Sequence, residues 1–197
     1  MMQLGFSFVF PFLLIMALLQ GGAGLFGTLR GWRPTLILGL ISAFIAVAPV
    51  GGLPLARWMI SFNANFSISL TAILFYKVLE ITFGVKLLDK NALLTCWVFS
   101  LTAGVILYPM ALGLGRFDPY QAGWGFSWLF VVVCGVTIFL LIMKNRFAVV
   151  LIAAILAHNL HLLESTNLWD YLVDPFMVLV SCIALSSRFL RKLSNRA

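Results

Sequence analysis

The chain of 197 residues is 62% hydrophobic and only 10% charged. A mean hydropathy of +1.08 is too high for a water-soluble domain and predicts an integral membrane protein. The formal net charge is +7, but the basic residues lie in short loops beside apolar segments. That distribution is typical of membrane orientation, so we expect no nucleic-acid partner.

Three apolar segments in the first half of the chain predict membrane-spanning helices. They cover residues 6–29, 34–50 and 68–85. Pro34 suits the first turn of the second helix, and the glycines and proline that follow residue 50 end it. We expect residues 55–67 to form an outer loop or an interfacial turn. No Lys or Arg precedes Arg30, so the first helix lacks the basic region of a cleavable signal and should remain in the mature protein.

Four further apolar segments follow in the second half, at residues 92–114, 126–143, 147–163 and 171–189. The turn between the second and third of these is short enough to force an antiparallel pair. The last segment is the least regular, because Asp174 and Pro175 fall in its first turns. A six-helix alternative, in which one terminal segment lies at the membrane interface, therefore stays open.

Basic and acidic residues alternate from loop to loop along the sequence. If the C-terminal tail is cytoplasmic, ten of the thirteen basic residues lie on its side of the membrane. They are Arg30, Arg33, Lys86, Lys90, Lys144, Arg146, Arg188, Arg191, Lys192 and Arg196. We therefore predict an all-α polytopic bundle of about seven helices in a bacterial inner membrane. It forms a single domain over residues 1–197, with the N-terminus outside and the C-terminus cytoplasmic.

The only two histidines lie beside acidic residues at the predicted outer end of the sixth helix. His158, His161 and Glu164 follow at three-residue intervals, which places neighbours in that series on one side of a continuous helix. With Asp118 as a further partner, they are candidates for general acid and base catalysis. A structural role as hydrogen-bonded interfacial residues explains them as well. A third histidine is absent and the pattern is not HExxH, so we predict no metal and no cofactor.

Two arginines, Arg57 and Arg116, fall on the predicted outer side and break the orientation rule. One explanation is recognition of an anionic group such as a phosphate, and the other is pairing with nearby acids. The acids on that side are Asp118, Glu164, Asp170 and Asp174. Asn63 and Asn65 could orient a polar ligand, although turn formation explains them equally well. These outer polar residues form our candidate ligand-binding set.

Lys77 and Glu80 lie inside the third predicted helix, near the middle of the bilayer. Charges at that depth are costly, so the two side chains should face the bundle interior and pair with each other at three-residue spacing. Such a pair is a candidate for a transport pathway. It can also serve helix packing alone.

These patterns favour a non-catalytic role at the external face. The leading hypothesis is a subunit or substrate-binding component that engages a polar or lipid-linked ligand, with membrane lipid and another membrane protein as partners. The first alternative is a transferase or hydrolase acting on lipid head groups, and the second is a small transporter that uses Lys77 and Glu80. No nucleophile with an adjacent base and no phosphate-binding glycine loop supports catalysis directly.

Overall fold

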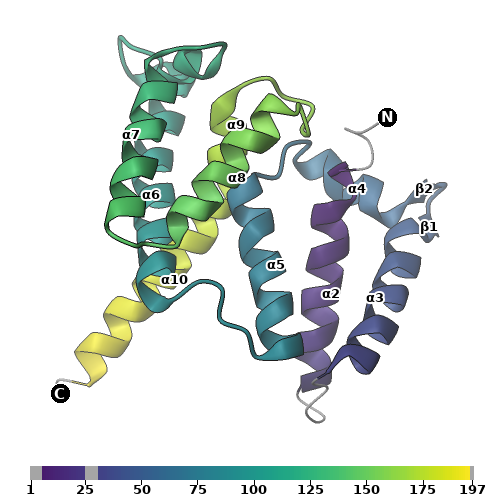
Figure 1. The fold of residues 1–197 in the computed structure, drawn as a ribbon. Coiled ribbons are helices and arrows are strands. Elements are labelled where there is room, and N and C mark those ends of the chain that lie inside the picture. The colour runs from purple at the N-terminus through teal and green to yellow at the C-terminus, as the bar shows by residue number, and fades with distance from the viewer. Residues whose placement is uncertain (1–5, 25–30, 196–197) are drawn as a thin grey trace. The chain divides into compact units, whose positions relative to one another are not determined.

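The computed structural model describes residues 6–24 and 31–195, and it is built almost entirely from helices (Figure 1). This confirms the all-α class. The predicted inner-side residues Arg30 and Arg196 lie outside the described residues. The chain divides into two compact units. Unit 1 comprises Met1–Phe66, Thr71–Leu87 and His161–Glu164, and unit 2 comprises Ser67–Leu70, Leu88–Leu160 and Ser165–Ala197. The single-domain organisation stays a prediction.

Unit 1 contains a helical core to which a short hairpin and an additional helix are attached. Its elements are α2 (Val9–Gly24), α3 (Trp32–Val47), β1 (Pro49–Val50), β2 (Leu53–Pro54), α4 (Leu55–Phe62) and most of α5 (Ile68–Phe83). The buried side chains of Ile15, Ala46 and Ala56 join α2, α3 and α4 in one cluster. Leu13 and Met16 of α2 pack with Val78 of α5 in another.

Both ends of α3 have a defined local structure. At its start, Thr82 Oγ1 accepts from Gln20 Nε2 and from Thr35 Oγ1, each at 3.0 Å, and so links three helices. Past its end, Gly51 and Gly52 adopt positive φ angles of 59° and 88° in the two-residue turn between β1 and β2. Such angles favour glycine, and they match a type I′ hairpin turn.

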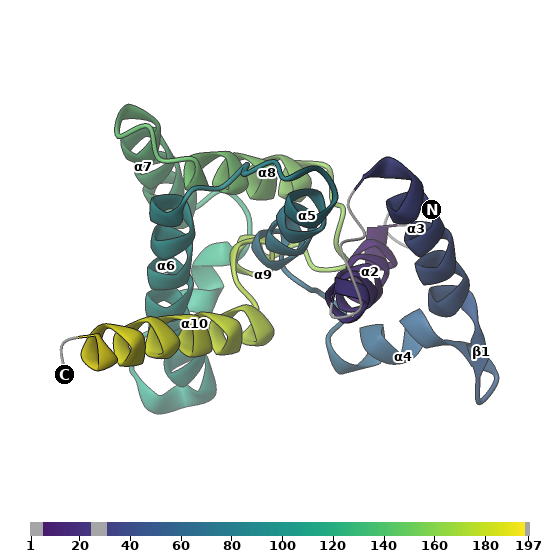
Figure 2. The ribbon, with the colours of Figure 1, turned by 90° about the horizontal axis from the view of Figure 1, so that it is seen from below.

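Unit 2 contains two helix pairs and a set of short outer turns. Its elements are α6 (Lys90–Pro109), a π turn (Met110–Leu114), a 3-10 turn (Pro119–Gly123), α7 (Trp128–Ile142), α8 (Phe147–Asn159), α9 (Leu168–Leu172) and α10 (Pro175–Ser194). The closest packing joins α6 and α10, where Gly104 lies against Val178. Ser100 on α6 and Met177 and Ser181 on α10 are buried. Figure 2 shows α10 crossing α6 rather than running alongside it.

Among the residues that the structure describes, one helical segment, Lys90–Leu114, is long and apolar enough to cross a membrane by length and composition. Apolar helices of 13 to 16 residues are formed by Val9–Gly24, Trp32–Val47, Trp128–Ile142 and Phe147–Asn159. At 1.5 Å per residue, sixteen residues cover about 24 Å, which is less than the roughly 30 Å of a hydrocarbon core. The polytopic arrangement is therefore taken up below as a proposal.

Several predicted helix ends differ from the observed ones for local reasons. The second predicted helix extended to residue 50, whereas α3 ends at Val47, two residues before Pro49. Residues 55–67 were expected to be a loop or an interfacial turn, and they contain the eight-residue helix α4. The last predicted helix began at residue 171, but α10 begins at Pro175 because Asp174 caps it, and it continues to Ser194.

Replacing Gly104 by alanine is expected to lower the free energy of unfolding by about 1–3 kcal/mol, because the added Cβ would overlap Val178. Gly135→Ala in α7 is the matched control. Nothing lies within 4 Å of a Cβ added there, so the gain in helix propensity should raise stability by up to about 1 kcal/mol. Thermal melting of both variants in one detergent measures the difference. A Gly104→Ala variant that melts no lower than the control would contradict the close crossing.

Candidate functional site

The sequence-predicted outer residues are divided between the two units. Arg57, Asn63, Asn65, His161 and Glu164 belong to unit 1. The remaining five, which are Arg116, Asp118, His158, Asp170 and Asp174, belong to unit 2. We therefore describe each set within its own unit.

Arg57 is held in place by the buried face of α4. Its neighbour Ala56 is fully buried against α2 and α3, and Ile60, one turn later, is buried too. The Trp58 indole donates a hydrogen bond of 2.7 Å to the Val50 carbonyl oxygen, which fixes α4 against the hairpin. Arg57 is exposed, and its guanidinium carbon lies 5.8 Å from the centre of the Phe8 ring. The arginine therefore stands over an aromatic side chain at the start of α2.

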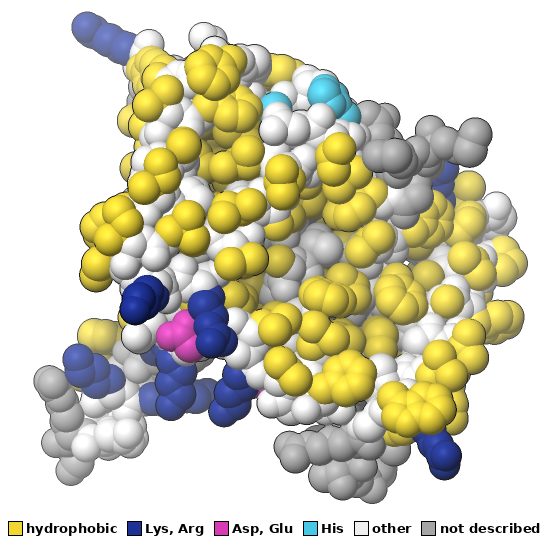
Figure 3. Space-filling view, viewed as in Figure 1, with side chains coloured by type: hydrophobic (Ala, Val, Ile, Leu, Met, Phe, Trp, Pro, Cys, Tyr) yellow, Lys and Arg dark blue, Asp and Glu magenta, His cyan; other side chains and the backbone are white. Residues whose placement is uncertain are grey.

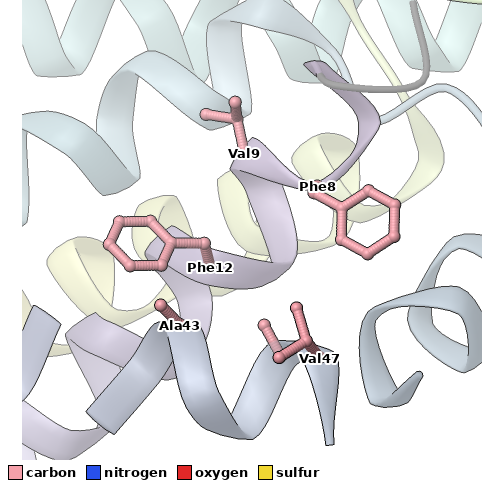
Figure 4. Close-up of a pocket in the computed structure, with 6 residues that line it drawn as sticks. Phe8, Val9, Phe12, Ala43 and Val47 are labelled. Carbon is pink, nitrogen blue, oxygen red and sulfur yellow. The ribbon is translucent and has the colours of Figure 1, made fainter. Parts of the chain in front are cut away.

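Phe8 also lines an apolar groove of about 270 Å³ between α2 and α3 (Figure 4). The other lining residues are Val9 and Phe12 from α2 and Ala43, Ala46 and Val47 from α3. All six side chains are hydrocarbon. A groove of this chemistry accepts an alkyl chain, and the arginine beside Phe8 offers a planar cation that binds phosphate or carboxylate. We call the cavity formed by the six lining residues the α2–α3 groove; Arg57 stands beside it.

The two asparagines after α4 shape the chain locally. The Asn63 side-chain oxygen accepts from the Asn65 backbone N–H at 3.1 Å, which makes a turn of the kind that asparagine favours. The turn delivers Phe66 to Phe10, whose rings stack at 3.7 Å. The Asn63 amide nitrogen is buried and has no acceptor among the residues that the structure describes. Turn formation thus accounts for the Asn63 oxygen, while its amide N–H groups remain able to donate.

His158, His161 and Glu164 do not share a helix face, and this corrects the sequence prediction. α8 ends at Asn159, and His161 adopts a positive φ of 52°. This left-handed conformation follows the helix C-terminus, where it turns the chain away from the helix axis. Glu164 then lies beyond the helix, exposed to solvent. The apolar character of residues 160–163 had suggested a longer helix than the backbone forms.

His158 is packed between aromatic rings in unit 2. Its ring centre lies 5.3 Å from that of Phe130 and 5.1 Å from that of Tyr171, with both pairs edge to face. Its Nε2 lies 3.1 Å from the Thr166 carbonyl oxygen. These contacts describe a histidine that holds the end of α8 against the segment before α9.

Residues 118–124 and 165–170 form a hydrogen-bonded structure that we call the outer cap. Asp118 Oδ1 accepts from the Tyr120 backbone N–H, and the Tyr120 hydroxyl donates to Asp170 Oδ2, each at 2.9 Å. Burial raises the pKa of the Tyr120 phenol, and the neighbouring Asp170 carboxylate adds to this shift. Two of the predicted ligand-binding acids are thus engaged inside the cap.

The centre of the outer cap is Asn167, which sequence reasoning missed. It is fully buried, its side-chain oxygen accepts from Trp169 N, and its amide donates to the Tyr120 carbonyl oxygen, each at 2.9 Å. The Trp169 indole donates to the Pro119 carbonyl oxygen at 2.9 Å. Gly123 approaches Asn167 so closely that no Cβ would fit. The partners lie 47 to 50 residues apart in sequence, so no local pattern reveals them.

Asp174 is a buried helix cap rather than an exposed acid. One of its oxygens accepts from Met177 N at 3.0 Å, and the other accepts from Ser67 N at 2.8 Å. Burial raises the pKa of this carboxyl, and the backbone donors oppose that shift. The sequence signal for this role is the Asp-Pro pair, because proline is favoured at the first position after the cap.

The outer arginines are not neutralised by the acids. Within the described ranges, neither Arg57 nor Arg116 has a carboxylate oxygen within 4.0 Å. Arg116 is exposed in the loop before the 3-10 turn. By contrast, Lys77 Nζ lies 2.8 Å from Glu80 Oε2 on α5, with the lysine side chain 51% exposed. No group of three potential metal ligands occurs in the part of the chain that the structure describes.

The chain matches no family model, no curated protein and no solved structure. The geometry of the two units is therefore the basis for any functional conclusion.

Replacing Asn167 by alanine should destabilise the protein by about 2–4 kcal/mol, because it leaves Trp169 N and the Tyr120 carbonyl without partners. Asn167→Asp keeps the oxygen that accepts from Trp169 N but loses the amide donor, so its loss of stability should be about half as large. The exposed Gln121 of the same cap is the control, and Gln121→Ala should change stability by less than about 0.5 kcal/mol. Thermal melting compares the three. Equal effects at Asn167 and Gln121 would contradict the central role of Asn167.

Replacing His161 by glycine should raise the free energy of unfolding by up to about 1 kcal/mol, because glycine adopts positive φ without steric cost. The same change at His158, inside α8 and between two rings, should lower stability by about 1 kcal/mol or more. Melting temperatures in one detergent provide the comparison. A lower melting temperature for His161→Gly would show that its imidazole matters more than its backbone position.

Proposed function

We propose that this chain is a multi-pass membrane protein that binds an anionic amphiphile in the α2–α3 groove at its external face. The alkyl part would lie along the six apolar lining residues, and Arg57 would hold a phosphate or carboxylate head group. The observation that carries the proposal is the single contact of Arg57 with Phe8, a residue that also lines the groove. The role is non-catalytic, as a substrate-binding component or a subunit that presents a lipid-linked ligand.

The charge pattern supports the membrane topology in this proposal. Within unit 2, α6 begins, α7 ends, α8 begins and α10 ends beside basic residues. These are Lys90, Lys144, Arg146, Arg188, Arg191 and Lys192. Asp174 caps the opposite end of α10, and Asp118 and Asp170 lie in the segments that connect the opposite ends of α6 and α7 and of α8 and α10. A cytoplasmic basic side is what a bacterial inner-membrane protein would show under the positive-inside rule.

The short helices are compatible with spanning if the bilayer adjusts. Segments shorter than the hydrocarbon core are accommodated by local thinning of the bilayer or by flanking residues that reach the interface. Trp32 at the start of α3 and Trp128 at the start of α7 are both exposed, as interfacial aromatic residues are. The many exposed apolar side chains of α3 and α7 would then face lipid or another membrane protein (Figure 3).

Head-group selection should rest on Arg57 rather than on the groove. Lipid tails are as apolar as the groove, so moving an alkyl chain between them brings little hydrophobic gain. A hydrogen bond to a charged group contributes about 1.5–3 kcal/mol. The groove would therefore orient the ligand, and the guanidinium would decide which ligand is bound.

The enzymatic alternative would need His158 or His161 beside Glu164 or Asp118. The contacts of His158 are with aromatic rings, and Asp118 accepts a backbone N–H. The transporter alternative rests on Lys77 and Glu80, which pair with each other on α5 and leave the lysine side chain 51% exposed rather than in the bundle interior. Neither arrangement offers a binding surface comparable to the α2–α3 groove.

Arg57→Gln should weaken binding of a fluorescent phosphatidic acid by about tenfold or more, because the bidentate anion contact is lost. Arg57→Lys keeps the charge but not the two parallel donors of the guanidinium, so its affinity should lie between those of the wild type and Arg57→Gln. Ala43 is exposed and lines the groove, so Ala43→Phe should fill it and also reduce binding. The measurement is a titration of the purified full chain in detergent, with fluorescent phosphatidylcholine as the zwitterionic comparison.

Arg116→Gln is the matched control, because it removes the other outer arginine from the other unit. It should leave binding unchanged, and all variants should melt at the wild-type temperature. Equal loss in both arginine variants, or wild-type binding by Arg57→Gln, would overturn the proposal.

A further inference from the structure

The second half of α10 differs from the first half in its environment. In the first half, Met177 and Ser181 are buried against α6. From Ser186 to Ser194, every residue is exposed except the partly buried Ser187. Figures 1 and 2 both show the C-terminal end of α10 projecting away from the other helices of unit 2. The last turns of this helix are therefore formed without covering the core.

These last turns are amphipathic. At 3.6 residues per turn, Arg188, Arg191 and Lys192 lie on one side of the helix. The other side carries three exposed apolar side chains: Phe189 (64% exposed), Leu190 (63%) and Leu193 (49%). α10 has 20 residues, yet it is not among the segments apolar enough to span a membrane. A helix with these two sides suits a boundary between water and hydrocarbon.

Basic residues outnumber acidic ones at this end of unit 2. α10 itself contains no Asp or Glu. Lys90 begins α6, and Lys144 and Arg146 lie in the turn between α7 and α8. The acid there, in the described part of unit 2, is Asp89, whose side chain accepts from Ala92 N to cap α6. The helix dipole favours cations at a C-terminus, but it does not account for the exposed apolar side.

We propose that residues 186–194 of α10 lie on the cytoplasmic membrane surface and bind anionic phospholipid head groups there. Arg188, Arg191 and Lys192 would contact the phosphates, while Phe189, Leu190 and Leu193 enter the acyl boundary. A lipid surface thereby provides partners for both the basic and the apolar side of the helix. A nucleic acid would leave the apolar side in water. The inference uses the membrane setting of α6 and does not depend on a ligand in the α2–α3 groove.

The test is hydrogen–deuterium exchange of the backbone amides of residues 186–194 in the full chain, reconstituted in nanodiscs. One disc contains phosphatidylcholine alone, and the other contains about one third phosphatidylglycerol. Exchange should be about tenfold slower in the anionic discs, since each cation near such a surface strengthens attraction about fivefold. Raising the salt concentration should reduce the difference.

Arg188→Gln with Lys192→Gln should abolish the difference between the two lipids. The double variant Lys90→Gln with Lys144→Gln removes the same amount of charge from the same end of unit 2, and it should leave the difference in exchange between the two lipids unchanged. Equal exchange of wild type in both discs would overturn the proposal, as would equal effects of the two double variants. Protection that follows a co-purifying protein rather than the lipid would assign this surface to that protein. Because the signal comes from residues 186–194 alone, failure of groove binding would not produce any of these outcomes.

Discussion

The crossing of α6 and α10 at Gly104 is the contact on which the rest of unit 2 depends. In the proposed membrane setting, lipid would compete equally for apolar side chains, so helix association would require close van der Waals contact through small residues. Gly104 provides that approach to Val178, and the buried Ser100 and Ser181 lie on the same helices. Once α10 is fixed there, its cap Asp174 stands where it can accept from Ser67 N, just before α5 begins.

The acids of unit 2 that were predicted to lie outside also serve local structure. Asp118, Asp170 and Asp174 each accept a hydrogen bond from a backbone N–H or a tyrosine hydroxyl of unit 2. These hydrogen bonds stabilise turns and the start of α10. Within the described part of unit 1, Arg57 has an aromatic ring as its neighbour and no carboxylate oxygen within 4.0 Å. A phenylalanine face attracts a guanidinium by about 0.5–1 kcal/mol at exposed sites, less than a phosphate would.

Much of the helical order could be predicted from the sequence, because apolar segments and the prolines between them mark helices reliably. The lengths could not, since hydropathy continues past the residue where the backbone turns. Residues 160–163 are mostly apolar, yet the helix ends at Asn159 because His161 adopts a left-handed conformation. α4 was missed as a helix, although Ala56 and Ile60 at four-residue spacing carry its buried face. The central role of Asn167 was missed because the Tyr120 carbonyl that its amide contacts lies 47 residues away, and its local bond to Trp169 N is one that many turn asparagines make.

The positive residues of α4 and of α10 differ in what they can discriminate. Arg57 is a single planar donor beside a groove, so its contribution depends on the shape and charge of one head group. Arg188, Arg191 and Lys192 form a cluster on an exposed helix, where attraction depends on the charge density of a surface and is screened by salt. A site for one ligand needs the first arrangement, and a stable attachment to a membrane needs the second. Under the two proposals, α4 would select the ligand and α10 would attach the chain to the membrane surface, so ligand selection at Arg57 could vary without weakening that attachment.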